Sequence, residues 1–263
     1  MINLIGVPYD ANSSFLKGPA FAPQRIRLMD TEGSANAFAE NGVEFNNGVN
    51  YIDHGDMEFQ TTDPSIAFET IKSRIAGLLK NNEKVLSIGG DHSVSYPIVS
   101  AFLEQYDQLN ILHIDAHADI YDDFDNNPYS HASPFARLLE SGKVKSLTQV
   151  GIRTLNQHQR DQIAKFGVNV IEMRDHNLDF ISKLQHPLYI SLDIDGLDPA
   201  YAPGVSHHEP GGLSTRHVID IIQKIPVEIV GADLVEYNPV RDINNMTAMV
   251  GYKLMKELMA KMV

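Results

Sequence analysis

Eight short runs of β-branched and aliphatic residues recur along the chain, separated by longer segments with helical spacing. The most central runs are apolar on both faces, which is typical of parallel strands covered by helices. The runs lie at residues 2–7, 49–55, 84–90, 110–117, 148–153, 168–173, 188–196 and 228–236. The helical patterns lie at residues 65–82, 96–106, 158–167 and 215–225, and in the segment from residue 246 to the end. Strands that alternate with helices predict an α/β fold with three α/β/α layers.

The composition limits the classes of protein to consider. The 263 residues show no repeat, linker or shift in composition, so we expect a single domain over 1–263. A formal net charge of −13 argues against a nucleic-acid partner, because such binding rests on clustered Lys and Arg. Since the chain has no cysteine, only His and carboxylates remain as protein metal ligands.

Targeting signals are not recognisable in the sequence. The first residues, MINLIGVPYD, show no signal-peptide or transit pattern. No apolar run approaches the roughly 20 residues that span a bilayer. We therefore expect a cytoplasmic protein without a membrane partner.

Carboxylates and histidines follow three of the apolar runs, in GGDHS (89–93), DAHAD (115–119) and DIDGLD (193–198). In open α/β sheets ligands bind beyond the carboxyl ends of the strands, so these motifs would share one crevice if their strands are neighbours. Period-two geometry would place Asp115, His117 and Asp119 in one row of ligands. The candidate metal ligands are His92, Asp115, His117, Asp119, Asp193 and Asp195.

Gathered carboxylates repel one another unless they are neutralised, and divalent cations are the natural counter-charge. A set of carboxylates and imidazoles without sulfur suits Mn²⁺ first, then Fe²⁺, Co²⁺ or Ni²⁺, with Zn²⁺ also possible. Taken singly, each motif also fits a chance match, an anion-binding helix start or a capping Asp. Three such motifs at strand ends favour a site for two metals.

The three motifs resemble, in order and spacing, the signatures of the ureohydrolases, the arginase and agmatinase family. The resemblance implies a three-layer α/β/α fold with an eight-stranded parallel sheet, two Mn²⁺ per chain and a trimer or hexamer. It is closest to plant-type arginases in residues 12–27, 129–140, 150–153, 204–214 and 231–242.

Roles of the ligands follow from this resemblance. His92 and Asp119 would bind one metal and His117 would bind the other. Asp195 would join His117, while Asp115 and Asp193 would bridge both ions. Two cations about 3.5 to 4 Å apart can hold a bridging hydroxide at neutral pH, which would attack the central carbon of a guanidinium group.

Two further residues complete the catalytic set that the resemblance implies together with Asp119. Glu236 should bind the guanidinium of the substrate, and His131 should pass a proton to the leaving amine. Without the resemblance, Glu236 reads as a salt-bridge partner of Arg241, and His131 reads as a helix cap. We expect His113 to support the ligands or the core.

The substrate is less well determined than the reaction. In the loop IYDDFDNNPYS (120–130), Asn126 and Asn127 are candidate substrate contacts, as is His208 in the loop SHHEPGG, which otherwise reads as structural. The plant-type frame favours L-arginine, which would yield ornithine and urea. The loop's acidic residues, Asp122, Asp123 and Asp125, would favour a second cationic group, as in agmatine.

The sequence is also compatible with other functions. Agmatine is the runner-up substrate, and other guanidino compounds are further alternatives. A protein of this fold that binds metal without turnover is a remote alternative. A related deacetylase with one zinc ion would also use a similar fold.

Overall fold

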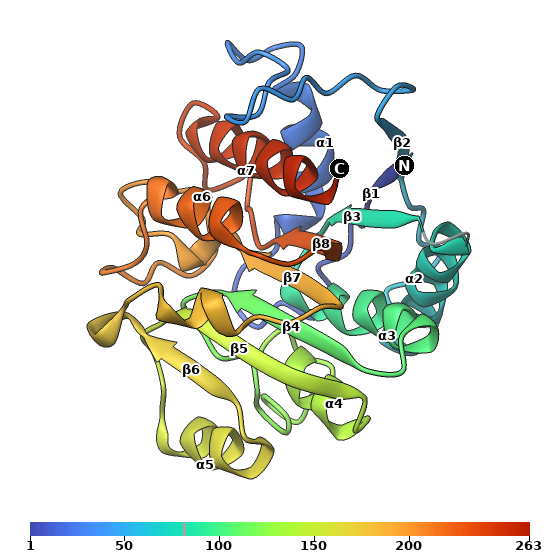
Figure 1. Ribbon diagram of the computed structural model, residues 1–263. Helices are drawn as coiled ribbons and strands as arrows, with labels where there is room; N and C mark the ends of the chain where they lie inside the picture. Colours follow the sequence, from blue (N-terminus) through green and yellow to red (C-terminus); the bar gives the residue numbers. More distant parts are fainter. Residues whose placement is uncertain (81–82) are drawn as a thin grey trace.

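The eight strands lie side by side in one parallel sheet (Figure 1). The computed structural model describes residues 1–80 and 83–263. The order across the sheet is β2-β1-β3-β8-β7-β4-β5-β6. The strands are β1 (Ile2–Gly6), β2 (Tyr51–Asp56), β3 (Lys84–Ile88), β4 (Leu109–Ile114), β5 (Val144–Ile152), β6 (Asn169–Glu172), β7 (Leu188–Asp193) and β8 (Ile229–Val235). The predicted fold class is confirmed.

Seven α-helices accompany the strands in the described part of the chain. They are α1 (Ala22–Leu28), α2 (Pro64–Leu78), α3 (Ser95–Gln105), α4 (Pro134–Glu140), α5 (Gln157–Phe166), α6 (Thr215–Lys224) and α7 (Met246–Met262). The helices α1 and α4 were not predicted, because seven residues are too few to show a helical period. The helix expected over 65–82 ends at Leu78, and residues 81–82 lie outside the described residues.

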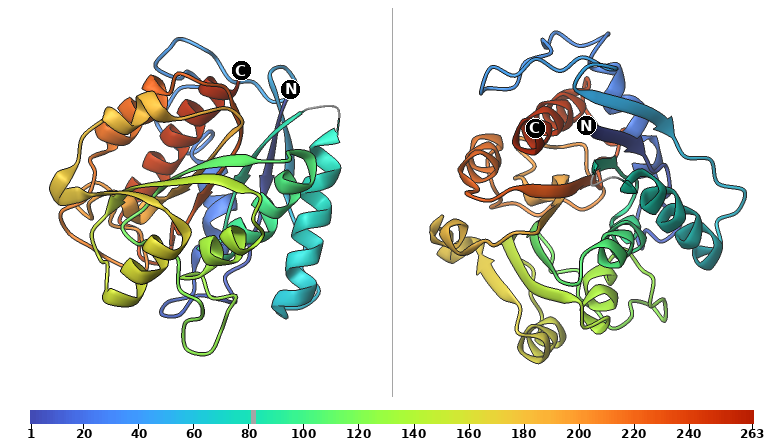
Figure 2. Two further views of the ribbon diagram at one scale, coloured as in Figure 1. Left: turned by 60° about the horizontal axis from the view of Figure 1, so that its bottom comes forward. Right: turned by 45° about the vertical axis from the view of Figure 1, so that its right-hand side comes forward.

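Helices cover both faces of the sheet (Figure 2). On one face α1, α6 and α7 pack through residues such as Ile26, Ile222 and Leu254. On the other face α2 and α3 pack through residues such as Ile71 and Phe102. Every residue of β4, β7 and β8 is buried, which explains why their sequences are apolar on both faces. Among the described residues, no helix combines the length and the apolar character needed to cross a membrane.

The strand order brings the polar motifs together. The strands β3, β8, β7 and β4 are consecutive neighbours, and their register aligns Ile88 with Leu234 and Ile114 with Leu192. Because these strands are parallel, their carboxyl ends meet at one edge of the sheet. The segments that follow them therefore converge, although they are far apart in the sequence.

Candidate metal centre and active site

Tight turns, rather than extended strands, place the candidate ligands. The strand β4 ends at Ile114, and the chain then bends, so that Asp119 has a left-handed φ of 48°. Asp115 Oδ1 accepts a hydrogen bond of 2.7 Å from the backbone N–H of His117. Asp193 likewise accepts one of 2.7 Å from the N–H of Asp195. The expected extended row of ligands is therefore wrong, because each leading Asp side chain stabilises a turn.

His92 lies at the centre of the first group of ligands. Its Nδ1 lies 3.0 Å from an oxygen of Asp119 and 3.2 Å from oxygens of Asp115 and Asp193. This buried nitrogen makes no hydrogen bond with any described residue. Its Nε2 lies 2.9 Å from the hydroxyl of Ser191. A buried ring nitrogen without a hydrogen bond, facing three carboxylates, indicates a site for a cation. The cation would bind the nitrogen and neutralise the carboxylates.

The Ser191 hydroxyl determines which nitrogen of His92 is free. It donates a hydrogen bond of 2.7 Å to Asp233, so it accepts from His92 Nε2. The ring proton is then on Nε2, and the lone pair of Nδ1 points at the carboxylates. This is the tautomer that a metal ligand needs.

A second group of ligands shares Asp115 with the first. Asp115 Oδ1 lies 3.4 Å from His117 Nδ1, which is also 3.1 Å from Asp195 Oδ2. Asp115, His117 and Asp195 are close enough together to hold one ion. Because the other Asp115 oxygen faces His92, this carboxylate lies between the two groups, and the site is suited to two divalent metals.

The buried carboxylates of the site favour the binding of a cation. Burial and the neighbouring Asp195 and Asp115 raise the pKa of Asp193 well above its usual range. Burial also raises the pKa of Asp195 to about 6, although His117 opposes the change. Burial lowers the pKa of His92, but three carboxylates outweigh it and raise that pKa well above the ordinary value. Divalent cations would supply the positive charge that these groups otherwise take up as protons.

Glu236 and His131 form a pair beside these groups. Glu236 Oε1 accepts hydrogen bonds of 2.8 Å from the backbone N–H of His92 and from His131 Nδ1. Among the described residues its ion-pair partner is therefore His131 and not Arg241. Burial opposes a charge on His131, but Glu236 raises its pKa to about 9. The N-cap residue of α4 is Ser133, so His131 does not cap that helix.

Ser14 holds the other side of the His131 ring. Its hydroxyl lies 2.8 Å from His131 Nε2, and in the neutral ring its backbone N–H donates to the same nitrogen over 3.2 Å. The N–H of His131 also donates to the carbonyl of Asn12. His131 is thus fixed on three sides.

A cavity of about 200 Å³ opens onto the site. Six predicted residues line it: His117, Asp119, His131, Asp193, Asp195 and Glu236. Seven others had no predicted role in the site: Ser14, Tyr121, Phe124, Ala132, Thr154, Gln159 and His207. Ser14, Tyr121, Phe124 and His207 lie in segments used for the family resemblance or the substrate loop, but nothing in the sequence shows which side chains face the cavity.

Three predicted substrate contacts are not among the described residues that line the cavity. His208 is bonded through Nε2 to the carbonyl of Pro203 over 2.7 Å, whereas its neighbour His207 lines the cavity. Asn126 is exposed, and Asn127 donates to the side chain of Asn12. These placements correct the expectation, because the backbone turns direct adjacent side chains to opposite sides.

Arg153 braces the strand ends below the cavity and was not predicted to matter. Its guanidinium donates to the carbonyls of Asp195 over 2.8 Å, Gly151 over 3.0 Å and Glu209 over 2.6 Å. It thereby joins the end of β5 to the turn that carries Asp195. Two sequence signals pointed to it: its place at the end of the run TQVGIR and its place in segment 150–153 of the family resemblance.

The fold and the site together define the class of α/β/α proteins with a two-metal centre at the carboxyl edge of a parallel sheet. The chain belongs to the Arginase family, whose model matches residues 1–261. It is 46% identical to arginase 1, mitochondrial, of Arabidopsis thaliana, over 98% of this chain and 80% of that protein. It is 30% identical to an agmatinase of Bacillus anthracis, over 97% of this chain and 90% of the agmatinase. An arginase structure from Medicago truncatula matches with a TM-score of 0.91 and 41% identity, over 99% of this chain and 87% of that one.

The names of the plant relatives bear on location. Similar arginases of Oryza sativa and Medicago truncatula are also named mitochondrial. This finding contradicts the expectation of a cytoplasmic protein. That expectation rested on the lack of a recognisable targeting pattern, which is weak evidence.

Proposed function

We propose that this protein is a manganese-dependent hydrolase that cleaves L-arginine to ornithine and urea. The observation that carries the proposal is the position of Asp115, with one oxygen toward His92 and the other toward His117. His92 and Asp119 would hold one metal, and His117 and Asp195 the other. Asp115 and Asp193 would bridge the two ions.

Manganese is the proposed metal because of the donor atoms. The set consists of four carboxylates and two imidazoles, and the chain has no cysteine to offer a thiolate. Such hard and borderline ligands suit Mn²⁺ better than Ca²⁺ or Mg²⁺, which bind imidazole poorly. When bound, two such ions lower the pKa of coordinated water and so supply the nucleophile.

Glu236 would bind and orient the guanidinium. Its Oε1 is engaged by His92 and His131, and no donor among the described residues reaches Oε2. Oε2 therefore remains as an acceptor for a guanidinium N–H at the wall of the cavity. A charged hydrogen bond there would hold the central carbon of the substrate over the ligand cluster.

His131 would supply the proton that the leaving amine needs. Its Nδ1 is bonded to Glu236, and its Nε2 lies at the cavity wall beside Ser14. Because its pKa is raised to about 9, the imidazole takes up a second proton, on Nε2, at neutral pH. The Ser14 hydroxyl can accept a hydrogen bond from this proton, and the ring can act as a general acid. The products would then separate as urea and an amine.

The substrate loop supports arginine over agmatine. Asp122 accepts from Gln162 and lies 3.8 Å from Lys165, both on α5. Asp123 accepts from the backbone of Asn126. Within the described chain these acidic groups do not line the cavity, so they do not provide a contact for the second cation of agmatine. The greater identity to a plant arginase than to an agmatinase agrees with this choice.

A panel of substrates tests the proposal. The Mn²⁺-loaded protein is incubated separately with arginine, agmatine, guanidinobutyrate and guanidine, and urea is measured. We expect release from arginine, with a kcat/KM at least about tenfold above that for any other compound, which corresponds to roughly 1.4 kcal/mol. Preference for agmatine would overturn the choice of substrate, and silence with two metals bound would favour a protein that only binds metal. One metal per chain would favour the deacetylase alternative.

We also propose that residues 1–263 form one domain that assembles into trimers or hexamers. All eight strands share one sheet, which supports a single domain. Two segments with exposed apolar side chains, one around Lys17 and one around Asn238, contact each other. The side chain of Asn238 donates a hydrogen bond to the carbonyl of Lys17. The exposed side chains include Phe15, Phe21, Val240 and Ile243, which are 55–70% exposed. Such surface is typical of an interface between subunits, and a mass of one chain in solution would contradict the assembly.

A further inference from the structure

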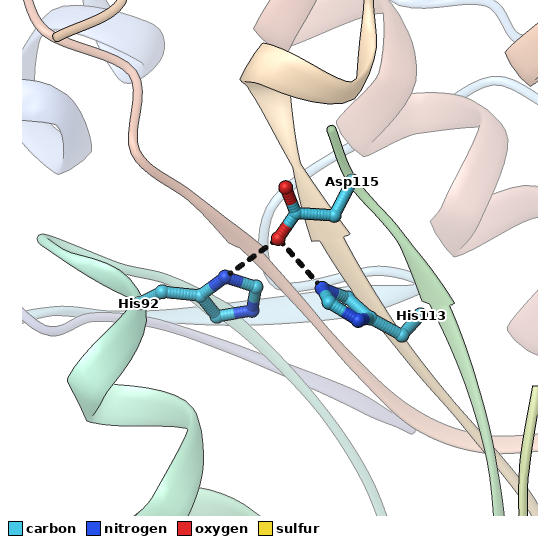
Figure 3. A group of neighbouring side chains, drawn as sticks. All are labelled: His92, His113 and Asp115. Carbon is cyan, nitrogen blue, oxygen red and sulfur yellow. Dashed lines mark hydrogen bonds and ion pairs between the residues drawn. The ribbon is translucent and has the colours of Figure 1, made fainter. Parts of the chain in front are cut away.

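We propose that His113 and Gln149 form a positioning pair that holds the Asp115 carboxylate in place, and that His113 is not itself a metal ligand. The inference rests on the proposed function of Asp115. His92, His113 and Asp115 lie close enough together to hold an ion (Figure 3). Proximity alone therefore does not show which of the two imidazoles is the ligand. The hydrogen bonds of each ring distinguish them.

Gln149 determines the tautomer of His113. Its side-chain nitrogen donates to the carbonyl of Ala118 over 2.6 Å, and a carbonyl can only accept. The amide nitrogen, and not the oxygen, therefore faces Ala118. The same nitrogen lies 2.9 Å from His113 Nδ1, so its second hydrogen points at the ring. His113 Nδ1 must then be the acceptor, and the ring proton is on Nε2.

That proton is directed at the proposed bridging carboxylate. His113 Nε2 donates to Asp115 Oδ2 over 2.7 Å (Figure 3). Both ring nitrogens of His113 are thus engaged, and neither has a lone pair left for a metal. His92 differs, because its buried Nδ1 makes no hydrogen bond with any described residue. The hydrogen bonds of the two rings therefore make His92 the proposed metal ligand and His113 the residue that orients the ligand Asp115.

The orientation of Asp115 depends on this bond. Its Oδ1 is held by the N–H of His117 over 2.7 Å, and its Oδ2 is held by His113. With both oxygens held, the carboxylate plane cannot rotate, and one oxygen faces each group of ligands. The fully buried His113 ring packs against Phe135 with 4.0 Å between the ring centroids and a tilt of 33° between the planes, which keeps the donor in position. Without the donor, Oδ2 would lose its fixed direction toward the first metal.

Two substitutions of His113 test the pair. His113→Leu removes the donor, whereas His113→Gln can place an amide nitrogen near the position of ring Nε2. The metal-free proteins are titrated with Mn²⁺, and bound metal is measured after dialysis. We expect His113→Leu to weaken metal binding by about 10- to 100-fold, the usual cost of losing a partner of a ligand. We expect His113→Gln to restore most of the affinity.

Gln149→Met provides an independent test at a second position. It removes the donor to Nδ1 while roughly preserving side-chain volume, and we expect a loss of affinity in the same direction. Thr148→Val is the matched control, because Thr148 is a neighbour on β5 whose side chain points to the other face. Thermal unfolding of each metal-free variant separates a weakened site from a weakened fold, and Gln149→Met decides the matter if His113→Leu does not fold.

The outcomes distinguish this inference from the proposed metal centre. Wild-type affinity in both His113→Leu and Gln149→Met would overturn the positioning pair. Complete loss of one metal in both His113 variants, with Gln149→Met unaffected, would make His113 a ligand and also overturn it. A wild-type chain that binds no metal would overturn the metal centre itself.

Discussion

Replacing Asp115 by Asn is expected to reduce urea release by at least about 10³-fold and to lower the bound metal from two ions per chain to one or none. The substitution keeps the shape of the side chain but removes its charge and replaces one oxygen by an NH₂ group. That group would point a donor at His92 or at His117, where the wild-type protein has an acceptor. Loss of the shared carboxylate removes several kcal/mol of metal-derived stabilisation of the transition state.

Elemental analysis and a urea assay measure the two effects. Asp123→Asn is the matched control, since it removes the same charge from an exposed residue that is not a described part of the cavity lining. We expect this control to keep two metals and near-normal activity. An Asp115→Asn protein with two tightly bound metals would show that the shared position of this carboxylate is not needed for binding.

Replacing Glu236 by Gln should have the second largest effect, a fall in kcat/KM of about 10²-fold or more. The variant loses the charge that would orient the guanidinium, and it loses the partner that keeps His131 protonated. Metal content should stay at the wild-type level, because Glu236 is not a proposed ligand. This separation of activity from metal binding distinguishes Glu236 from Asp115.

The same variant should change how stability depends on pH. In the wild-type protein Glu236 raises the pKa of His131 to about 9, above the value of about 6.5 expected in the unfolded chain. The pair therefore stabilises the fold fully below about pH 6.5, as long as Glu236 is ionised, and the stabilisation is lost as pH rises through about 9. The difference in unfolding free energy between wild type and Glu236→Gln should shrink over this range.

Chemical denaturation of the metal-free proteins at a series of pH values measures this difference. Glu58→Gln is a suitable control, because Glu58 is an exposed residue outside the His131 pair. We expect its difference from wild type to stay nearly constant between pH 6.5 and 9. A Glu236→Gln difference that is equally flat would mean that the ion pair with His131 does not stabilise the fold.

Most of the architecture could be read from local patterns. The apolar runs predicted all eight strands. The signal is clearest for β4, β7 and β8, because a strand buried on both faces is apolar along its whole length. The short helices α1 and α4 escaped prediction because two helical turns carry no measurable period. The polar motifs lie at the carboxyl ends of β3, β4 and β7, so their place at strand ends was also visible in the sequence.

The details of the site were less accessible. The alternation of Asp115, His117 and Asp119 suggested an extended row, but side-chain hydrogen bonds to the backbone bend the chain there instead. His207, rather than His208, faces the cavity, because the direction of a loop side chain depends on backbone torsions that adjacent letters do not reveal. The acidic loop residues suggested a cationic substrate until their bonds to α5 and to the loop itself were seen.

The sequence by itself determined the fold class, the ligand types and the family, because these depend on local periodicity and on the chemical identity of residues at strand ends. Only the tertiary structure decided which of these residues meet. The strand order places β8 and β7 between β3 and β4, so that His92, Asp193 and Asp115 converge from distant segments. The tertiary structure also showed that Gln149 makes Nε2 of His113 a hydrogen-bond donor, whereas Ser191 leaves the lone pair on Nδ1 of His92 free. Two chemically identical rings differ in this way because a tautomer is set by neighbours in space, not by neighbours in sequence.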